Sequence, residues 1–531
     1  MLAAMRNAPP PAAPRRSRDG RWALLIAAAL CASYGANRDF LVGSDAVGNV
    51  FVAANLVEDG RLSFTPTRDP AHFEWMLRPP DGQPVDGILS GDTLLGGVRA
   101  ADLWSRGLLV PTSSYYHLTP SRRSDPATGE PVFVNTFGPG AGIAAAPVLA
   151  AVRLFAGDLR RHPEALWYGA KLAASLLVAA SAAFVFLAAR AWLSPALAAL
   201  VALGYGLGTC VFSVSSQALW QHPAAECFLA LGALLLVRAV GVAPVGAALR
   251  ERWWYAGAGA AFACAAACRP PDAVFALAVA GWLAVVRPRA LAAYLAGAAP
   301  FAAALAAYNA YFFGAPWSFG QTAAGPAIAL SKTGSPDLWQ TPLLTGLAGT
   351  LLSPSRGLLV YSPVLGLGLA GAALAWRRAG WAPLRPLAVG AALLLLVESK
   401  WFDWWGGWAY GYRRVVDLAP ILALLAAPAL GWIVAARWRR AVFGGLLAWS
   451  VLVQVVGAFA YEPRGWNARR EGPAGPAQLA QDIDDPRYRG RLWSWSDAQI
   501  PYYLAHFAAA RAEREELVRT SIDRWRPGPG E

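Results

Sequence analysis

Residues 167–189 read WYGAKLAASLLVAASAAFVFLAA, an apolar run that holds one charged residue, Lys171. An α-helix needs about 20 mainly apolar residues to cross the hydrocarbon core of a bilayer. Similar runs recur along the chain, and they do not alternate between apolar and polar residues as barrel strands do. The sequence therefore predicts an all-α polytopic membrane protein. The further spans that we predict are residues 22–36, 196–212, 222–237, 253–267, 272–286, 291–313, 358–376, 384–397, 415–436 and 441–461.

The composition fits this class. Of the 531 residues, 56% are hydrophobic and 15% are charged, whereas about a quarter are charged in soluble proteins. The net charge of +13 comes almost wholly from arginine, and in a membrane protein a basic balance indicates orientation rather than nucleic-acid binding. The five cysteines form no CxxC pair and the five histidines are scattered, so the spacing does not indicate a zinc site.

The arginines at the ends of the apolar runs decide the expected topology. Residues 141–155 are only moderately apolar, and every later turn changes side if this run crosses the membrane. The positive-inside rule prefers that it does not cross, because one set of arginines then faces the cytoplasm. We therefore expect an interfacial or re-entrant helix there and a multi-pass protein of the plasma (inner) membrane. That set comprises Arg190, Arg238, Arg250, Arg252, Arg287, Arg289, Arg377, Arg378, Arg437, Arg439 and Arg440.

This topology divides the chain into three regions. Residues 1–21 are basic and rich in Pro and Ala, which predicts a disordered cytoplasmic N-terminus. Residues 22–461 are the transmembrane domain, in which residues 43–166 form a long first external loop with interfacial helices. Residues 462–531 form an extracytoplasmic C-terminal segment. The polar and aromatic segments all fall on the outer face, so the function is expected there.

A second stretch, residues 41–62 (LVGSDAVGNVFVAANLVEDGRL), follows the first span. Its apolar residues recur at the spacing of one helical face, which predicts a short helix lying on the membrane. Asp45 would stand at its start. From the residues alone, this carboxylate is more simply a helix cap than a reactive group. The apolar residues are Val47, Val50, Phe51, Ala54 and Val57.

Five phrases on the expected outer face resemble the GT-C integral-membrane glycosyltransferases, especially the protein-mannosyltransferase-like branch, which uses polyprenyl-phosphate sugars. The resemblance covers most of residues 22–461, and it implies a helical bundle of about eleven transmembrane helices. The family often has two adjacent acids in the first phrase, whereas Ser44 precedes Asp45 here. The phrases are residues 44–62, 137–147, 308–316, 353–363 and 405–413.

The resemblance implies transfer of a sugar from a polyprenyl-phosphate donor to an envelope acceptor at the extracytoplasmic face. Because phosphate leaves as a stable anion, one general base suffices, and the resemblance makes Asp45 that base. Arg269, Arg356 and Arg413 are expected to bind the donor phosphate, since the guanidinium group binds phosphate oxygens without losing its proton. Their alternative role is to anchor the protein to anionic lipid headgroups.

Further contacts to the sugar or the lipid are expected from His222, Trp404, Trp405 and Tyr410. Indole rings stack on sugar faces, although an aromatic belt at the membrane edge would look the same. A hydrogen-bonded interfacial histidine is equally consistent with His222. The sequence shows no clear metal-ligand set, and a divalent metal is left open.

Two other functions fit a chain of this kind: a transporter or flippase of lipid-linked glycans, and a non-catalytic GT-C-like assembly protein. Ion-coupled transport needs ionisable residues in mid-membrane. Lys171 and Glu226 fall near the outer ends of their spans, which counts against ion-coupled transport but not against passive flipping. New glycosidic product would separate an enzyme from both alternatives.

Two short motifs are discounted. Gly366-x-Gly368-x-x-Gly371 matches a dinucleotide-binding fingerprint, but it lies in an apolar span without a preceding strand, so we expect helix-packing glycines. Asp482-Ile483-Asp484 resembles the metal-binding DxD of nucleotide-sugar transferases. It lies in an irregular tail, so we interpret it as a solvated acidic run.

Overall fold

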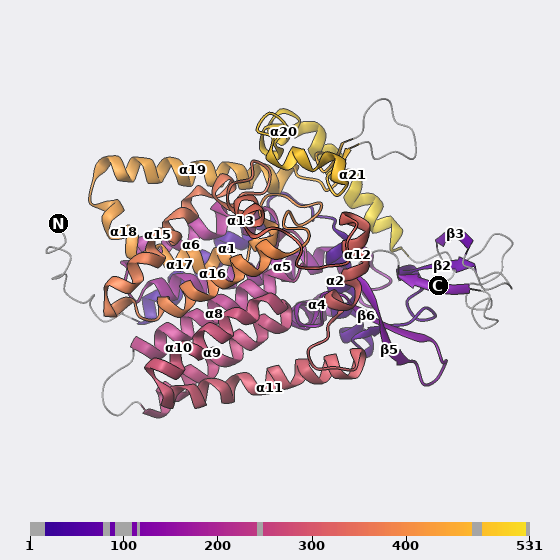
Figure 1. Ribbon diagram of the computed structural model, residues 1–531, viewed down its shortest axis with the longest axis horizontal. Helices are drawn as coiled ribbons and strands as arrows, with labels where there is room; N and C mark the ends of the chain where they lie inside the picture. The colour runs from indigo at the N-terminus through magenta and orange to yellow at the C-terminus, as the bar shows by residue number, and fades with distance from the viewer. Residues whose placement is uncertain are drawn as a thin grey trace.

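The computed structural model describes residues 16–77, 85–90, 109–113, 117–241, 248–469 and 481–526. It is mostly helical, and its long helices lie side by side in one bundle (Figure 1). Every predicted apolar run forms helix, which confirms the helical class. The bundle contains α1 (Arg16–Gly35), α5 (Pro163–Ala189), α6 (Pro195–Gly208), α7 (Cys210–Ser213), α8 (His222–Gly241), α9 (Ala248–Cys268), α10 (Ala273–Val286), α11 (Pro288–Phe313), α15 (Gly366–Leu374), α16 (Leu384–Lys400), α17 (Leu418–Leu425), α18 (Ala427–Val434) and α19 (Arg437–Ala460).

Among the described residues, four helices are long and apolar enough to cross a membrane: α5, α8, α11 and α19. A fifth candidate combines α6 with residues 210–217, which continue it after a bend of 45°. The other predicted spans form helices that are shorter, broken or more polar, so the expected number of about eleven stays a prediction. The run at residues 141–155 becomes α4 (Gly140–Ala156), one of the shorter apolar helices.

Glycine allows the closest helix contacts in the bundle. A Cβ atom on Gly259 of α9 would lie 2.0 Å from the carbonyl oxygen of Tyr294 in α11. In α15, Cβ atoms on Gly368 and Gly371 would lie 2.3 and 1.7 Å from carbonyl oxygens of α17. Small residues let helix backbones approach in this way inside a membrane. The packing interpretation is therefore confirmed for Gly368 and Gly371, whereas a Cβ atom on Gly366 would meet only the Leu359 side chain at 3.5 Å.

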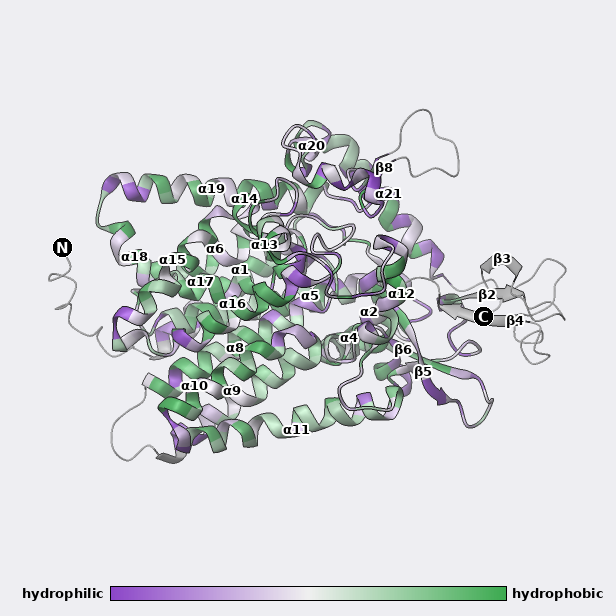
Figure 2. Cartoon of the chain, viewed as in Figure 1, coloured by the Kyte–Doolittle hydropathy of each residue, from purple (hydrophilic) through white to green (hydrophobic). Residues whose placement is uncertain are grey.

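The two ends of the bundle differ. The turns from α10 to α11 and from α18 to α19, where arginines cluster, lie at the left in Figure 1. The helix α2 (Ser44–Asp59) and the helix α12 (Gly320–Thr333) lie at the right. Figure 2 shows hydrophobic residues along the helices between these ends, and hydrophilic residues gathered near them. The arginine-rich turns and α2 are thus separated by the length of the bundle.

The first loop contains small β-sheets that an all-α prediction misses. The sheet β1-β6-β5 pairs Phe64 with Phe133 and Leu118 with Asn135, and a second sheet has the order β3-β2-β4. Val132, Phe133 and Val134 favour extended backbone, but their run is too short to stand out between Pro- and Gly-rich stretches. The strands are β1 (Ser63–Phe64), β2 (Phe73–Leu77), β3 (Val85–Ser90), β4 (Leu109–Ser113), β5 (Leu118–Ser124) and β6 (Pro131–Asn135).

The helix α2 exists as predicted, but it is buried inside the protein. Asn49 and Asn55, which lie away from the predicted apolar face, are fully buried. Asn49 donates a hydrogen bond to the carbonyl oxygen of Leu219 and accepts one from Asn135. The helix packs against α4 and β6. It is therefore a fixed element between the first loop and the bundle.

The remaining elements are the first helix, the C-terminal segment and the short connections between the bundle helices. The helix α1 begins at Arg16, within the region expected to be disordered, and residues 1–15 lie outside the described residues. In the C-terminal segment, α21 (Phe507–Arg524) packs against α5 and α19. The other elements are η1 (Pro70–His72), η2 (Ser215–Gln217), η3 (Pro270–Asp272), α13 (Leu343–Leu352), α14 (Leu358–Tyr361), η4 (Pro363–Leu365), η5 (Ala375–Arg377), η6 (Ala379–Trp381), η7 (Arg413–Val415), β7 (Ala468–Arg469), β8 (Gln481–Asp482), η8 (Pro486–Trp493) and α20 (Gln499–Ala505).

Candidate functional site

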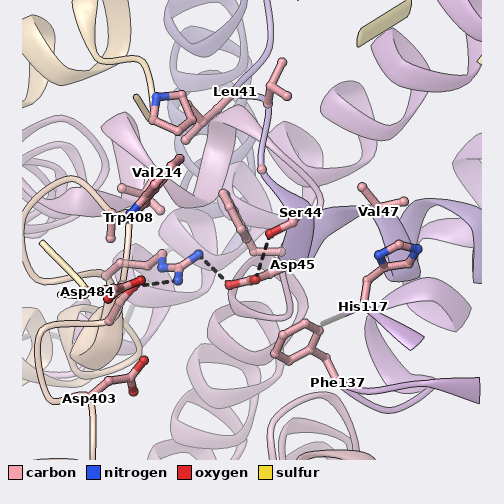
Figure 3. A pocket seen from close by; sticks show the side chains of 18 of the residues that line it. Leu41, Ser44, Asp45, Val47, His117, Phe137, Val214, Asp403, Trp408 and Asp484 are labelled. Carbon is pink, nitrogen blue, oxygen red and sulfur yellow. Dashed lines mark hydrogen bonds and ion pairs between the residues drawn. The ribbon is translucent and has the colours of Figure 1, made fainter. Parts of the chain in front are cut away.

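A pocket of about 540 Å³ opens at the end of the bundle that carries α2 and α12. Its walls come from the first loop, from α12, from the loop of residues 401–414 and from the C-terminal segment. This volume lies in the range of about 300–1,000 Å³ that is usual for small-molecule sites. In Figure 3, Asp45 lies between His117 and Phe137 on one side and Trp408, Asp403 and Asp484 on the other.

Asp45 stands in the first turn of α2, and its carboxylate points into the pocket. Its Oδ2 atom lies 2.9 Å from Nη1 of Arg413, and 28% of its side chain is exposed. The hydroxyl of Ser44 donates a longer hydrogen bond of 3.4 Å to Oδ1. The structure thus brings together the two residues that the sequence assigned to the base and to the donor phosphate.

Arg413 is held by the loop that precedes it. Its Nη2 donates to the carbonyl oxygen of Gly406 at 2.8 Å, and its guanidinium lies 4.7 Å from the centre of the Trp220 ring. Gly406, Gly407 and Gly411 adopt positive φ angles of 71°, 62° and 55°, which glycine reaches without steric cost. The tight loop therefore presents Arg413 to the pocket next to Asp45.

The other two predicted phosphate-binding arginines are occupied elsewhere. Arg269 is buried, and it contacts Glu398 at 2.7 Å and Asp417 at 2.8 Å. Burial disfavours its charge, but these carboxylates raise the pKa of the Arg269 guanidinium above its usual value. Arg356 is also buried, and it donates to the carbonyl oxygens of Trp405 and Gly407. Arg269 borders a small side cavity and Arg356 fixes the 401–414 loop, so neither lines the main pocket in the described residues.

His222 lies at the start of α8 and is buried. Its Nδ1 atom is 2.9 Å from Oδ2 of Asp417. A cavity of about 40 Å³ beside the main pocket is lined by His222, Arg269, Asp45 and Arg413 among others. His222 therefore has a satisfied partner, as the simpler interpretation expected, and it also borders the site.

Of the three aromatic candidates, one lines the pocket and two do not. Tyr410 lines the pocket, but its hydroxyl donates to the carbonyl oxygen of Val453. Trp404 and Trp405 are buried, and neither is among the described pocket-lining residues. Trp405 donates its indole N–H to Asp484. The tryptophans of this loop that do line the pocket are Trp401 and Trp408.

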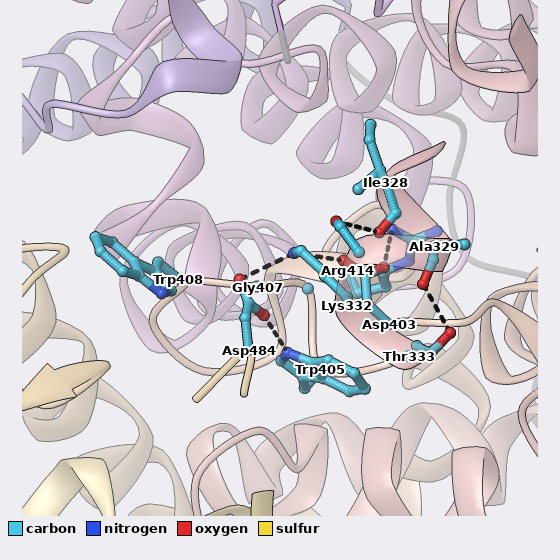
Figure 4. A network of polar contacts seen from close by, with 12 residues as sticks. Ile328, Ala329, Lys332, Thr333, Asp403, Trp405, Gly407, Trp408, Arg414 and Asp484 are labelled. Carbon is cyan, nitrogen blue, oxygen red and sulfur yellow. Dashed lines mark hydrogen bonds and ion pairs between the residues drawn. The ribbon is translucent and has the colours of Figure 1, made fainter. Parts of the chain in front are cut away.

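An ionic network that no sequence motif indicated (Figure 4) lies on the wall across the pocket from Asp45 (Figure 3). Lys332 of α12 lies 2.9 Å from Asp484 and 3.5 Å from Asp403, and Arg414 lies 3.2 Å from Asp403. Burial raises the pKa of the Asp403 carboxyl, while Lys332 and Arg414 act to lower it. Lys332 and Asp403 belong to segments far apart in the sequence, so no local spacing could have joined them.

The Asp482-Ile483-Asp484 motif is part of this wall. Asp482 accepts a hydrogen bond of 2.8 Å from the indole of Trp408, and Ile483 is fully buried. Both aspartates line the pocket. The interpretation as a solvated acidic run is therefore wrong, because the C-terminal segment folds back over the 401–414 loop. Among the described residues, no group of three or more His, Cys, Asp or Glu side chains could hold a metal ion.

Two buried histidines lie behind α2. Nδ1 of His72 is 3.3 Å from Nε2 of His117, and His117 lines the pocket. Burial lowers the pKa of His72 to about 3 and the pKa of His117 well below its usual value. Both rings are thus neutral at physiological pH.

Glu462, just after α19, anchors the C-terminal segment. Its carboxylate accepts hydrogen bonds from the backbone N–H groups of Arg464 and Gly465, and its carbonyl oxygen accepts one from the Tyr503 hydroxyl. Burial, with a contribution from Glu513, raises the pKa of Glu462 from 4.5 to about 7. The proton is therefore held more tightly in the folded state than in the unfolded state.

This pKa predicts a pH dependence of stability. The contribution of protonated Glu462 is fully present below about pH 4.5 and is lost as the pH rises to about 7. The free energy of unfolding of the wild type, measured by thermal unfolding, should fall by up to about 3 kcal/mol across this pH window because of this group. The Glu462→Gln variant should show a flatter curve from pH 5 to pH 7. Equal slopes in the two proteins would contradict the assignment.

Comparison with known proteins adds no relationship to this geometry. No protein-family model matches the chain, and no curated protein matches it.

Proposed function

We propose that this protein is a membrane glycosyltransferase of the GT-C type, which moves a sugar from a polyprenyl-phosphate donor to an envelope acceptor. The observation that carries the proposal is the direct contact of 2.9 Å between Asp45 and Arg413 in the pocket. A base and a cation within one donor headgroup of each other are what this reaction requires.

The chemistry assigns a role to each residue. An acceptor hydroxyl or amine attacks the anomeric carbon, the bond from that carbon to the phosphate oxygen breaks, and Asp45 takes the acceptor proton. The guanidinium of Arg413 turns from Asp45 to the phosphate as its charge grows, because it binds both anions through the same N–H groups. In the absence of donor, Arg413 therefore holds the Asp45 carboxylate beside the place where the donor phosphate would bind.

The charges of the pocket suit a phosphate. The pocket is lined by five cationic side chains and four carboxylates, an excess of one positive charge: Arg413, Arg414, Lys332, Arg464 and Arg524 against Asp45, Asp403, Asp482 and Asp484. The aromatic side chains on the same walls offer faces for a sugar ring or a prenyl chain. They are Phe137, Trp167, Trp220, Trp401, Phe402, Trp408, Tyr410, Tyr461 and Trp525.

The proposal includes the finer topology: about eleven spans, a cytoplasmic N-terminus and an extracytoplasmic C-terminus in the plasma membrane. It is supported by the position of the arginine-rich turns at the end of the bundle opposite α2 (Figure 1). A lipid-linked donor then reaches the pocket from the outer leaflet.

The test uses the full chain reconstituted in nanodiscs with a panel of polyprenyl-phosphate monosaccharides and an envelope extract as acceptor. We expect one donor to yield a new glycosidic product by mass spectrometry. In proteoliposomes, movement of the donor between leaflets without any product would favour a flippase. Absence of both activities would favour a non-catalytic assembly protein.

Arg413→Gln should weaken donor use rather than folding. Loss of a charged hydrogen bond of about 1.5–3 kcal/mol predicts a 10- to 100-fold rise in the KM for the donor. Steady-state kinetics against donor concentration measure this. Arg519→Gln is the matched control, since Arg519 is an exposed arginine that pairs with Glu516. An unchanged KM in Arg413→Gln would remove Arg413 from the donor site.

A further inference from the structure

The small cavity beside the pocket joins the predicted base to a second proton-binding group. The cavity has a volume of about 40 Å³, and its lining includes Asp45, His222 and Gln221. A polar cavity of at least about 10–15 Å³ holds a water molecule. The lining groups donate and accept hydrogen bonds, and the cavity has room for water between the Asp45 carboxylate and the imidazole.

Asp417 fixes the orientation of that imidazole. Its two carboxylate oxygens lie 3.2 and 2.9 Å from Nδ1 of His222. A carboxylate only accepts hydrogen bonds, so Nδ1 carries the hydrogen and Nε2 keeps the lone pair. Asp417 is itself held 2.8 Å from Nη1 of Arg269. The arrangement is that of a histidine oriented by a buried carboxylate, which prepares Nε2 to accept a proton.

We propose that His222 and Asp417 form a proton-accepting dyad that takes the acceptor proton from Asp45. This inference rests on the proposed glycosyl transfer and adds to it a second site for the proton. Asp45 is ion-paired with Arg413, and protonation of its carboxylate releases that guanidinium to the leaving phosphate. A second proton site is needed because Asp45 must lose this proton before it can pair with Arg413 again.

The step balances as follows. The acceptor oxygen forms its bond to the anomeric carbon, and the electrons of the breaking bond go to the phosphate oxygen. The acceptor proton passes to Asp45 and then, through water in the small cavity, to Nε2 of His222. Asp417 stabilises the imidazolium that results, and the proton leaves to solvent after product release.

The dyad lies among both signs of charge. Asp417 faces the imidazole from the start of α17, Arg269 contacts Asp417 from the turn after α9, and Glu226 lies one turn further along α8. Across the small cavity lie Asp45, Arg413 and Arg414. A positive imidazolium therefore has one direct carboxylate partner and is opposed by the neighbouring arginines, which favours its rapid loss of the proton.

The experiment compares His222→Gln and His222→Ala with the wild type, using the donor that gives product. We expect each variant to lower kcat about 10²-fold with an unchanged donor Kd, and the low-pH limb of the rate profile to shift. Added imidazole should restore at least a tenfold increase in rate to His222→Ala. His506→Gln is the control, because His506 is exposed and bonds only locally to Tyr502.

Full activity of His222→Gln would overturn the dyad and leave the glycosyltransferase proposal intact. A slow variant with weakened donor binding and no response to imidazole would also overturn it, since it would indicate a structural role. If the wild type gives no product with any donor, the proposed function fails, and the dyad fails with it.

Discussion

Asp45→Asn is expected to lower the rate of sugar transfer by 10²- to 10⁴-fold, the usual contribution of a general base. Asparagine has nearly the same shape but cannot take the proton, and it loses the ion pair of 2.9 Å to Arg413. Donor binding should persist, because Arg413 is then free to contact the phosphate. Transfer of a radiolabelled sugar and donor binding, measured on the same nanodisc preparation, check both statements.

The same helix supplies a matched control. Asp59 is the last residue of α2, its side chain is 33% exposed, and it pairs with arginines at 2.8 Å. It lies outside the described lining of the pocket. Asp59→Asn should therefore keep full transfer activity. If Asp45→Asn also retains it, another group is the base.

Arg269→Met is expected to destabilise the protein by about 3–5 kcal/mol. Only 3% of the Arg269 side chain is exposed, and it is the common cation of Glu398, Asp417 and Asp272. Its removal takes the cation from buried Asp272 and Asp417 and leaves Glu398 with Arg414 alone, which costs far more than the lost contacts alone. Unfolding in mixed micelles, followed by tryptophan fluorescence, measures the change.

A second variant separates charge from packing. The double change Arg269→Met with Asp272→Asn removes a buried carboxylate whose ion-pair partner among the described residues is Arg269, and it should recover part of the lost stability. Arg487→Met is the surface control, since Arg487 is 77% exposed in its pair with Asp485 and should cost less than about 1 kcal/mol. A loss below 1 kcal/mol in Arg269→Met would show that the buried network is not needed for folding.

The sequence predicted much of the fold and part of the site. The lengths of the apolar runs predicted the positions of the helices correctly, because a buried helix needs a long, local run of apolar residues. The sequence also placed Asp45 at the start of a helix. Arg413 and His222 were candidate site residues from the sequence, and the structure brings both to the same cavity as Asp45. The short strands of the first loop were missed, since their runs are too brief to show a period.

Only the tertiary structure decided which charged residues face the pocket. In the sequence, three arginines at the ends of apolar runs look equivalent. In the structure, Arg269 is buried in ion pairs with carboxylates, Arg356 is buried with its N–H groups bonded to carbonyl oxygens, and Arg413 contacts Asp45 in the pocket. Lys332, Asp403 and Asp484 come together from separate segments. The spacing of apolar residues predicts which side of a single helix or strand is buried. The pairing of charged residues depends instead on how elements far apart in the sequence pack together.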